Sequence, residues 1–148
     1  SDLYGVDTVS LRYFNVYSED QQADGPYATT VANWMHCIRE GKRPFITGTG
    51  EQRRDMVHVD DVLDANVFAM QHDGSFGGQH FDIGTGKNIS LNEVRDIVQK
   101  HHDVEFEYRS PRPGEVMETI ADTDPYAKYG FEACVDLETG LNRCFSGI

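Results

Sequence analysis

The chain has few cysteines and no spaced set of metal ligands. Its three cysteines, Cys37, Cys134 and Cys144, form no Cys-x-x-Cys pair and are too few for a disulfide framework. We therefore expect a reducing, cytoplasmic location. The six histidines contain no ligand pattern, because His101 and His102 are adjacent and point in different directions on a helix, and we expect no metal site.

Long apolar runs and an excess of basic residues are also missing. No apolar run reaches the roughly 20 residues that span a bilayer, and Ser1 opens no signal-peptide pattern, so we expect no membrane association. The formal net charge is −12, whereas binding a nucleic acid requires clustered cations, so no nucleic-acid partner is expected. A length of 148 residues suits one domain, 1–148.

Periodicity and turn residues predict an α/β chain of short strands and about five helices. Alternating and β-branched segments predict strands at 8–17, 44–47, 56–59, 80–83 and 104–109. Helical spacing and capping residues predict helices at 28–40, from Asp60 or Asp61 to 73, from Ser90 onward, from Asp124 to Gly130, and after Asp136.

Three of these elements carry a specific expectation. The strand at 8–17 is rich in β-branched and aromatic residues and is expected to be mostly buried. The helix that Asp60 or Asp61 caps is apolar on most sides, so we expect it to be buried rather than amphipathic. Ser90 and Glu93 have the spacing of a capping box, which makes this helix start the clearest in the chain.

Two arginines on loops are the best candidates for binding an anion. Arg54 follows a glycine turn and Arg112 lies in a Pro-Gly loop, so a compact fold could bring them together. Arginine suits phosphate because its planar fork donates parallel hydrogen bonds and stays charged. The alternative is that Arg112 forms a surface pair with Glu115 or Asp122. The residues alone leave both interpretations open.

Two Gly-x-Gly elements occur, Gly48-Thr49-Gly50 and Gly84-Thr85-Gly86. Neither has the third glycine of a dinucleotide fingerprint. Tight turns at the ends of strands are the better interpretation.

Five blocks of sequence, in this order, resemble the C-terminal half of nucleotide-sugar epimerases, which belong to the extended short-chain dehydrogenase/reductases. The blocks are Leu11-Arg12-Tyr13-Phe14-Asn15-Val16-Tyr17, Gly50 to Asp55 with Val57-His58-Val59-Asp60-Asp61-Val62, Phe81 to Gly86 with Ser90-Leu91-Asn92-Glu93-Val94, Pro111 to Glu115, and Ala121-Asp122. The fold that the resemblance implies is the C-terminal portion of such a protein without its N-terminal Rossmann half. Residues 1–17 would then supply a strand of the Rossmann sheet.

The resemblance also implies a binding site for a nucleotide-diphosphate sugar, most simply a UDP-sugar. Asn15 would contact the sugar diphosphate, and Arg54 and Arg112 would clamp it. The remaining residues with an implied role are Glu115, which would accept from the ribose hydroxyls, Phe45 and Thr47, whose backbone would meet the uracil edge, and Thr119, which would leave room for a 2-acetamido group.

The chain departs from the family pattern in its catalytic residues. The family's catalytic Tyr-x-x-x-Lys and its Gly-rich NAD loop precede the strand that ends near Asn15, and no tyrosine here has a lysine four positions later. We expect the chain alone to hold no NAD, although the intact family does, and to be non-catalytic. Ser18-Glu19-Asp20 stands where the family has Gly-Pro-Arg, which places anions near the expected cleft.

Two other functions stay open. The chain could belong to a sugar-nucleotide 4,6-dehydratase, or it could be a non-catalytic interaction scaffold. The family places the strand at 8–17 inside a parallel sheet, covered on both faces. Its neighbours in that sheet are missing here, so we expect the strand to have an unpaired edge. We therefore expect the chain to self-associate through this strand.

Overall fold

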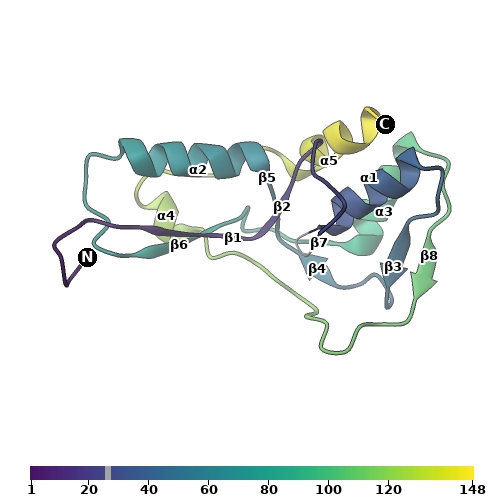
Figure 1. Ribbon diagram of the computed structural model, residues 1–148, viewed down its shortest axis with the longest axis horizontal. Helices are drawn as coiled ribbons and strands as arrows, with labels where there is room; N and C mark the ends of the chain where they lie inside the picture. The colour runs from purple at the N-terminus through teal and green to yellow at the C-terminus, as the bar shows by residue number, and fades with distance from the viewer. Residues whose placement is uncertain (26–27) are drawn as a thin grey trace.

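The computed structural model describes residues 1–25 and 28–148, which form an elongated molecule with the N-terminus at one end (Figure 1). The described residues form five helices and eight short strands. In chain order these are β1 (Ser10–Tyr13), β2 (Asn15–Tyr17), α1 (Thr30–Arg39), β3 (Phe45–Thr47), β4 (Arg53–Arg54), β5 (Met56–His58), α2 (Val59–Gln71), β6 (His80–Ile83), β7 (Ile89–Ser90), α3 (Leu91–His101), β8 (Glu107–Arg109), α4 (Asp124–Ala127) and α5 (Leu137–Ser146).

The strands pair two by two. β1 pairs with β6, β2 with β5 and β3 with β8, all parallel, whereas β4 and β7 are antiparallel. Parallel neighbours require crossover connections, and the long segments between the paired strands supply them with helices. The predicted α/β class with five helices is therefore confirmed.

The single strand predicted at 8–17 is two strands that change partner at Phe14. The Phe14 backbone N–H donates to the Ile83 carbonyl at 3.0 Å, and the Asn15 N–H donates to the Asp55 carbonyl at 3.2 Å. The expectation that this segment is mostly buried is wrong for β1, where Tyr13 is 48% exposed. β1 pairs with one neighbour, and only alternate side chains such as Leu11 pack against the core.

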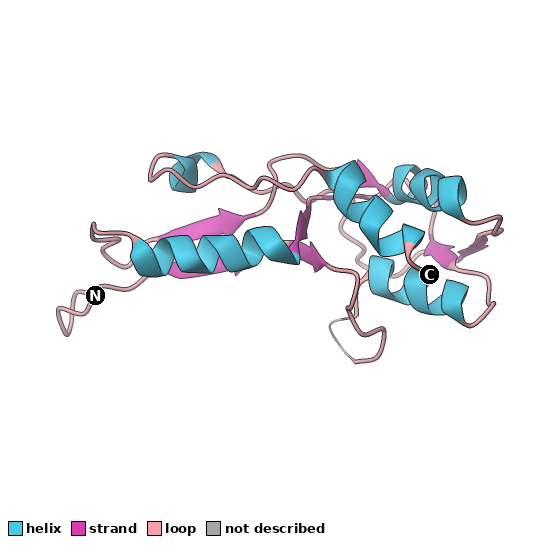
Figure 2. Ribbon diagram, turned by 90° about the horizontal axis from the view of Figure 1, so that it is seen from above, coloured by secondary structure: helices cyan, strands magenta, loops and turns pink. Residues whose placement is uncertain are grey.

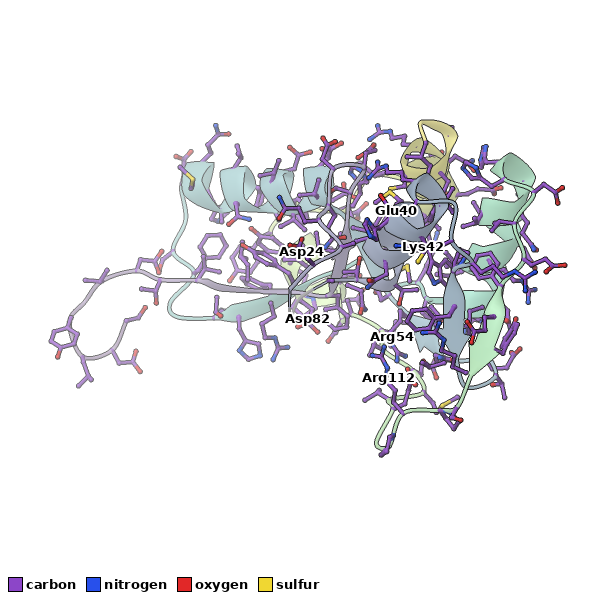
Figure 3. The ribbon with its side chains drawn as sticks, turned by 45° about the vertical axis from the view of Figure 1, so that its right-hand side comes forward. Asp24, Glu40, Lys42, Arg54, Asp82 and Arg112 are labelled. Carbon is purple, nitrogen blue, oxygen red and sulfur yellow. The ribbon has the colours of Figure 1, made fainter. Side chains whose placement is uncertain are left out.

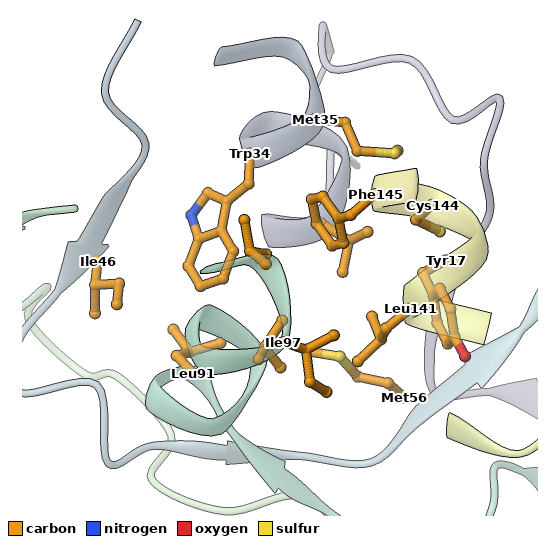
Figure 4. Close-up of a cluster of buried hydrophobic side chains, with 13 residues drawn as sticks. Tyr17, Trp34, Met35, Ile46, Met56, Leu91, Ile97, Leu141, Cys144 and Phe145 are labelled. Atoms are coloured by element: carbon orange, nitrogen blue, oxygen red, sulfur yellow. The ribbon is translucent and has the colours of Figure 1, made fainter. Parts of the chain in front are cut away.

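Two hydrophobic cores lie on either side of β5. Because successive residues of a strand point to opposite faces, Met56 packs into one core and Val57 into the other. The first core gathers α1, α3 and α5 around Trp34 and Phe145 (Figure 4). The second lies between α2, β6 and α4 (Figure 2). In this core the rings of Phe81 and Tyr126 stack. β5 thus holds the two groups of elements together.

Helix starts depend on side chains that satisfy the free N–H groups of the first turn. The capping box at α3 is confirmed: Ser90 Oγ accepts from the Glu93 N–H at 3.1 Å, and Glu93 accepts from the Ser90 N–H at 2.9 Å. The cap predicted at Asp60 or Asp61 is wrong, because α2 begins at Val59 and His58 Nδ1 accepts from the Asp60 N–H at 3.2 Å.

α2 is not buried on most sides as expected. One face packs on the second core through Val62 and Ala65, but Leu63, Val67 and Met70 are 58%, 47% and 84% exposed. No element among residues 1–25 and 28–148 covers this apolar face. Of the helices in the described residues, none combines the length and apolar character that crossing a bilayer requires.

Candidate functional site

A cavity of about 310 Å³ lies where α1, β3 and the end of β4 face the loop that follows β8. Six of the seven predicted site residues line it: Asn15, Phe45, Thr47, Arg54, Arg112 and Glu115. The seventh, Thr119, is outside the lining but accepts from the Asn15 side-chain amide at 3.3 Å. The structure therefore brings together residues that are up to 100 positions apart in the sequence.

The two arginines face this cavity from different elements (Figure 3). Arg54 Nη2 lies 3.4 Å from Glu115 Oε1, and both side chains are 18% exposed. The other terminal nitrogen of Arg54, Nη1, donates to the Arg53 carbonyl at 2.9 Å. Since Glu115 pairs with Arg54, the alternative of an Arg112–Glu115 surface pair does not apply. Within the described residues Arg112 forms no ion pair.

The loop of residues 110–119 carries Arg112 and Glu115 to the cavity. Pro111 and Pro113 lack backbone donors, which keeps this segment out of a helix or a central strand. Its ends are bonded to the core, since the Gly48 N–H donates to the Arg109 carbonyl and the Thr119 N–H to the Arg53 carbonyl. Between these points Glu115 joins the loop to β3 by accepting from Thr47 Oγ1 at 3.3 Å.

The start of α1 forms another wall, which the sequence analysis missed. Ala28, Thr29, Thr30 and Val31 line the cavity, and Thr29 caps the helix by accepting from the Ala32 N–H. The first turn contains no acidic residue. Free N–H groups and the positive end of the helix dipole favour an anion here. A threonine cap without nearby acids, in a chain with 25 acidic residues, was the available signal.

Asp55 was also missed. Its fully buried carboxylate accepts from the backbone N–H groups of Thr85, Gly86 and Ala121 at 2.8–3.0 Å and from the Thr85 hydroxyl. Its backbone carbonyl accepts from Asn15 Nδ2 at 2.7 Å. Asp55 therefore fixes the position of a cavity residue. A carboxylate at the start of a buried strand requires such donors, and this requirement could have revealed it.

The Gly-x-Gly elements are tight turns after β3 and β6, as predicted. Their amides bond within the chain: Gly86 donates to Asp55 and Gly48 to the Arg109 carbonyl. A Cβ at position 84 would collide with Ala121 and Asp55. These turns are therefore held by bonds and contacts within the chain.

Glu19, one of the anions that replace the family's Gly-Pro-Arg, is not among the residues that line the cavity. Its carboxylate lies 3.1 Å from Nε2 of the buried His58 and 3.9 Å from Arg143. Because Nδ1 of His58 accepts from the Asp60 N–H, Nε2 carries the proton and donates to Glu19. The acidic side chain is thereby directed toward α2 and α5.

Tyr17 lines the cavity, but its hydroxyl is buried against Gly140 of α5 and has no hydrogen-bond partner among the described residues. Burial raises the pKa of this phenol far above its usual value. The phenol is therefore protonated at ordinary pH, and its contribution to the cavity is the side of the ring.

The backbone of β3 is partly engaged. The Phe45 carbonyl accepts from Trp34 Nε1 at 2.8 Å, and the Thr47 carbonyl accepts from Gln52 Nε2 at 2.7 Å. Each carbonyl oxygen has a second lone pair. A ligand edge can therefore still bond to this strand.

Residues 1–84 match the protein family described as "NAD dependent epimerase/dehydratase family". The chain is 35% identical over 145 residues to a putative UDP-glucose 4-epimerase from Methanocaldococcus jannaschii, covering 95% of this chain and 45% of the relative. The chain belongs to the NAD-dependent epimerase/dehydratase family.

Solved structures of the family share the fold. UDP-glucose 4-epimerase from Thermotoga maritima, with UDP-glucose, superposes with a TM-score of 0.88 at 35% identity. UDP-N-acetylglucosamine 4-epimerase from Methanobrevibacter ruminantium, in complex with UDP-N-acetylmuramic acid, gives 0.88 at 30% identity. Both alignments cover 99% of this chain and 47% of the other. The chain thus spans about half the length of the relatives it matches, and it corresponds to part of an extended short-chain dehydrogenase/reductase.

Proposed function

We propose that this chain is the nucleotide-sugar-binding part of an NAD-dependent sugar-nucleotide epimerase, with a UDP-sugar as its ligand. The observation that carries the proposal is the joint presence of Arg54, Arg112 and the start of α1 in one cavity of an acidic chain. Two guanidinium groups and free helix N–H groups bind a diphosphate well. The relatives with UDP-glucose and UDP-N-acetylmuramic acid support the choice of a UDP-sugar.

In this proposal each residue has one role. Arg54 and Arg112 clamp the diphosphate, and Asn15 contacts it from the end of β2. Glu115 accepts from the ribose hydroxyls, and the backbone at Phe45 and Thr47 meets the uracil edge. The Arg54–Glu115 contact supports this division, because it holds a cation for phosphate and an acceptor for hydroxyl groups next to each other.

Thr119 lies beside Asn15, and we propose that it sets the size of the sugar that fits. A small threonine leaves room for a 2-acetamido group. Competition between UDP-glucose and UDP-N-acetylglucosamine tests this role. Binding of the acetamido sugar at least as strong as that of glucose supports it, and a strong preference for UDP-glucose contradicts it.

The proposal assigns no catalytic residue and no NAD site to these 148 residues. No tyrosine has a lysine four positions later, and the two glycine turns bond within the chain. The domain assignment follows the same reasoning: residues 1–148 act as one substrate-binding domain whose segment 1–17 belongs to a Rossmann sheet.

The family name also covers dehydratases, so a sugar-nucleotide 4,6-dehydratase is the second candidate. A cytoplasmic location is proposed with this function, consistent with three free cysteines.

Self-association through residues 8–17 is part of the proposal. Ser10 and Phe14 direct their N–H groups toward β6, so the alternate residues Leu11 and Tyr13 direct theirs to the open edge of β1. An open edge of this kind pairs readily with another strand. α2 lies along β1 (Figure 1), and its Leu63, Val67 and Met70 are exposed.

Calorimetric titration of the purified chain with UDP tests the function. Saturable binding near one UDP per chain supports the proposal. Absence of binding by a chain whose circular dichroism shows it to be folded contradicts it and favours the scaffold alternative.

A further inference from the structure

One face of the β3–β8 pair carries an aromatic ring and a cation in contact. The register places Phe45 opposite Glu107 and Thr47 opposite Arg109. Because side chains alternate along a strand and register partners share a face, all four lie on the same side of this pair. Ile46, between Phe45 and Thr47, points to the opposite side and is buried in the first core.

The Arg109 guanidinium lies over the Phe45 ring and also bonds to a neighbouring carboxylate. Its guanidinium carbon is 3.8 Å from the centroid of the Phe45 ring, well within the range of a cation–π contact. Arg109 Nη2 also donates to Glu107 Oε2 at 2.9 Å. The cation is therefore bonded to a carboxylate and lies over the Phe45 ring.

Phe45 also belongs to the cavity. It is among the residues that line the cavity, whereas Arg109, which contacts its ring, is not. The Phe45 carbonyl accepts from Trp34 Nε1 at 2.8 Å, which fixes the backbone of the same residue. The backbone of Phe45 is thus held by one hydrogen bond, and one face of its ring is in contact with Arg109.

We propose that Arg109 is a positioning residue that holds the Phe45 ring as the wall against which the nucleobase packs. This inference rests on the proposed nucleotide-sugar function and adds the group that orders the base end of the site. Neither Arg109 nor Glu107 is among the seven residues assigned to binding, and neither contacts the ligand in this proposal. Their effect passes through Phe45.

The test separates the base from the phosphates. The wild-type chain and the variants Arg109→Ala and Arg109→Lys are titrated with UDP and with inorganic pyrophosphate, which lacks the base. Arg109→Ala is expected to weaken UDP binding about two- to fivefold, the value of an exposed cation–π contact, and to leave pyrophosphate binding unchanged. Arg109→Lys keeps the charge but not the planar group, so it is expected to restore UDP binding only in part.

A double-mutant cycle with Phe45→Leu supplies the decisive comparison. If Arg109 acts through the ring, Arg109→Ala causes no further loss of UDP affinity once Phe45 is replaced. Arg43→Ala is the matched control. Arg43 lies just before β3, its side chain is 70% exposed, and it pairs with Glu105. It is expected to change neither titration.

The outcomes distinguish the two proposals. Equal losses for UDP and pyrophosphate, or full additivity with Phe45→Leu, overturn the positioning role while the nucleotide-binding function stands. A folded wild-type chain that binds neither compound overturns both.

Discussion

The Asp55 carboxylate accepts a hydrogen bond from the backbone N–H of Ala121 at 3.0 Å, which ties the start of β5 to the chain that leaves the loop of Arg112 and Glu115. The same carboxylate holds the turn after β6 through Thr85 and Gly86. A buried charge of this kind is stable only when its acceptor positions are filled. The walls of the cavity thus depend on a residue that does not line it.

Replacing Asp55 by Asn is expected to lower the free energy of unfolding by about 2–4 kcal/mol, because an amide group meets donors that need an acceptor. Urea denaturation measures this change. Asp64→Asn is the control, as Asp64 is an exposed residue of α2, and it is expected to change stability by less than about 0.5 kcal/mol. Equal stability of the Asp55 variant and the wild type would show that these bonds contribute little.

Gly140 and Tyr17 give a second prediction. A methyl group at position 140 would collide with the Tyr17 hydroxyl, so Gly140→Ala is expected to destabilise the chain by about 1–3 kcal/mol. Tyr17→Phe removes a hydroxyl that has no partner among the described residues and is expected to be neutral or stabilising.

The double variant tests the contact itself. Phenylalanine at position 17 is expected to reduce the cost of Gly140→Ala, although ring carbons at 3.0 and 3.1 Å remain close to the added methyl. Thermal melts of the four chains give the coupling. Simple additivity would mean that the hydroxyl is not the obstacle.

The capping box of α3 makes stability depend on pH. Hydrogen bonds from Ser90, with a smaller contribution from Arg53, lower the pKa of the Glu93 carboxyl. A lowered pKa in the folded state means that the ionised cap stabilises the chain above the usual glutamate pKa of about 4.3 and that this stabilisation is lost as pH falls through the lowered value.

Glu93→Gln keeps the shape of the cap but cannot ionise. Denaturation between pH 3 and 7 (roughly the range that brackets the glutamate pKa) is expected to show a smaller loss of stability at acid pH for the variant than for the wild type. If both chains lose stability in parallel, other carboxylates account for the acid sensitivity.

The open edge of β1 predicts a dimer or a larger assembly. Light scattering of the chain at high concentration is expected to give a mass above one chain, and Tyr13→Pro is expected to reduce it, because proline removes an N–H at the open edge. Tyr13→Val is the control, since it removes the ring but keeps the donor. A monomer at every concentration would argue against association through this strand.

The sequence predicted most of the elements because their signals are local. The Ser90–Glu93 box, the Asp136 cap of α5 and the helical spacing around Trp34 each depend on residues within two turns. The features that the sequence did not predict depend on residues that are distant in the chain. The break at Phe14 arises because β1 and β2 pair with different strands, and the exposed face of α2 depends on what packs against it.

In the candidate site, too, the sequence predicted individual residues but not the contacts between distant parts of the chain. Six predicted residues line one cavity. Arg54 and Arg112 were predicted from their own chemistry and loop positions, whereas Asn15, Phe45, Thr47 and Glu115 were assigned from the family resemblance. The start of α1 and the Asp55 network were missed because their roles appear only when distant backbone N–H groups come together. Thr119 was assigned from the resemblance and lies one contact behind the cavity, against Asn15.

The most direct test of the account is calorimetric titration of UDP against the wild-type chain, Arg54→Ala, Arg112→Ala and Arg12→Ala. In the proposed complex each cavity arginine would donate charge-assisted hydrogen bonds to the diphosphate, each worth roughly 1.5–3 kcal/mol, so either loss is expected to weaken binding about ten- to hundredfold. Arg12 pairs with Asp82 outside the cavity, and its replacement is expected to leave the affinity unchanged. Unchanged affinity in both Arg54→Ala and Arg112→Ala, with the fold intact, would contradict the claim that these two residues clamp a diphosphate.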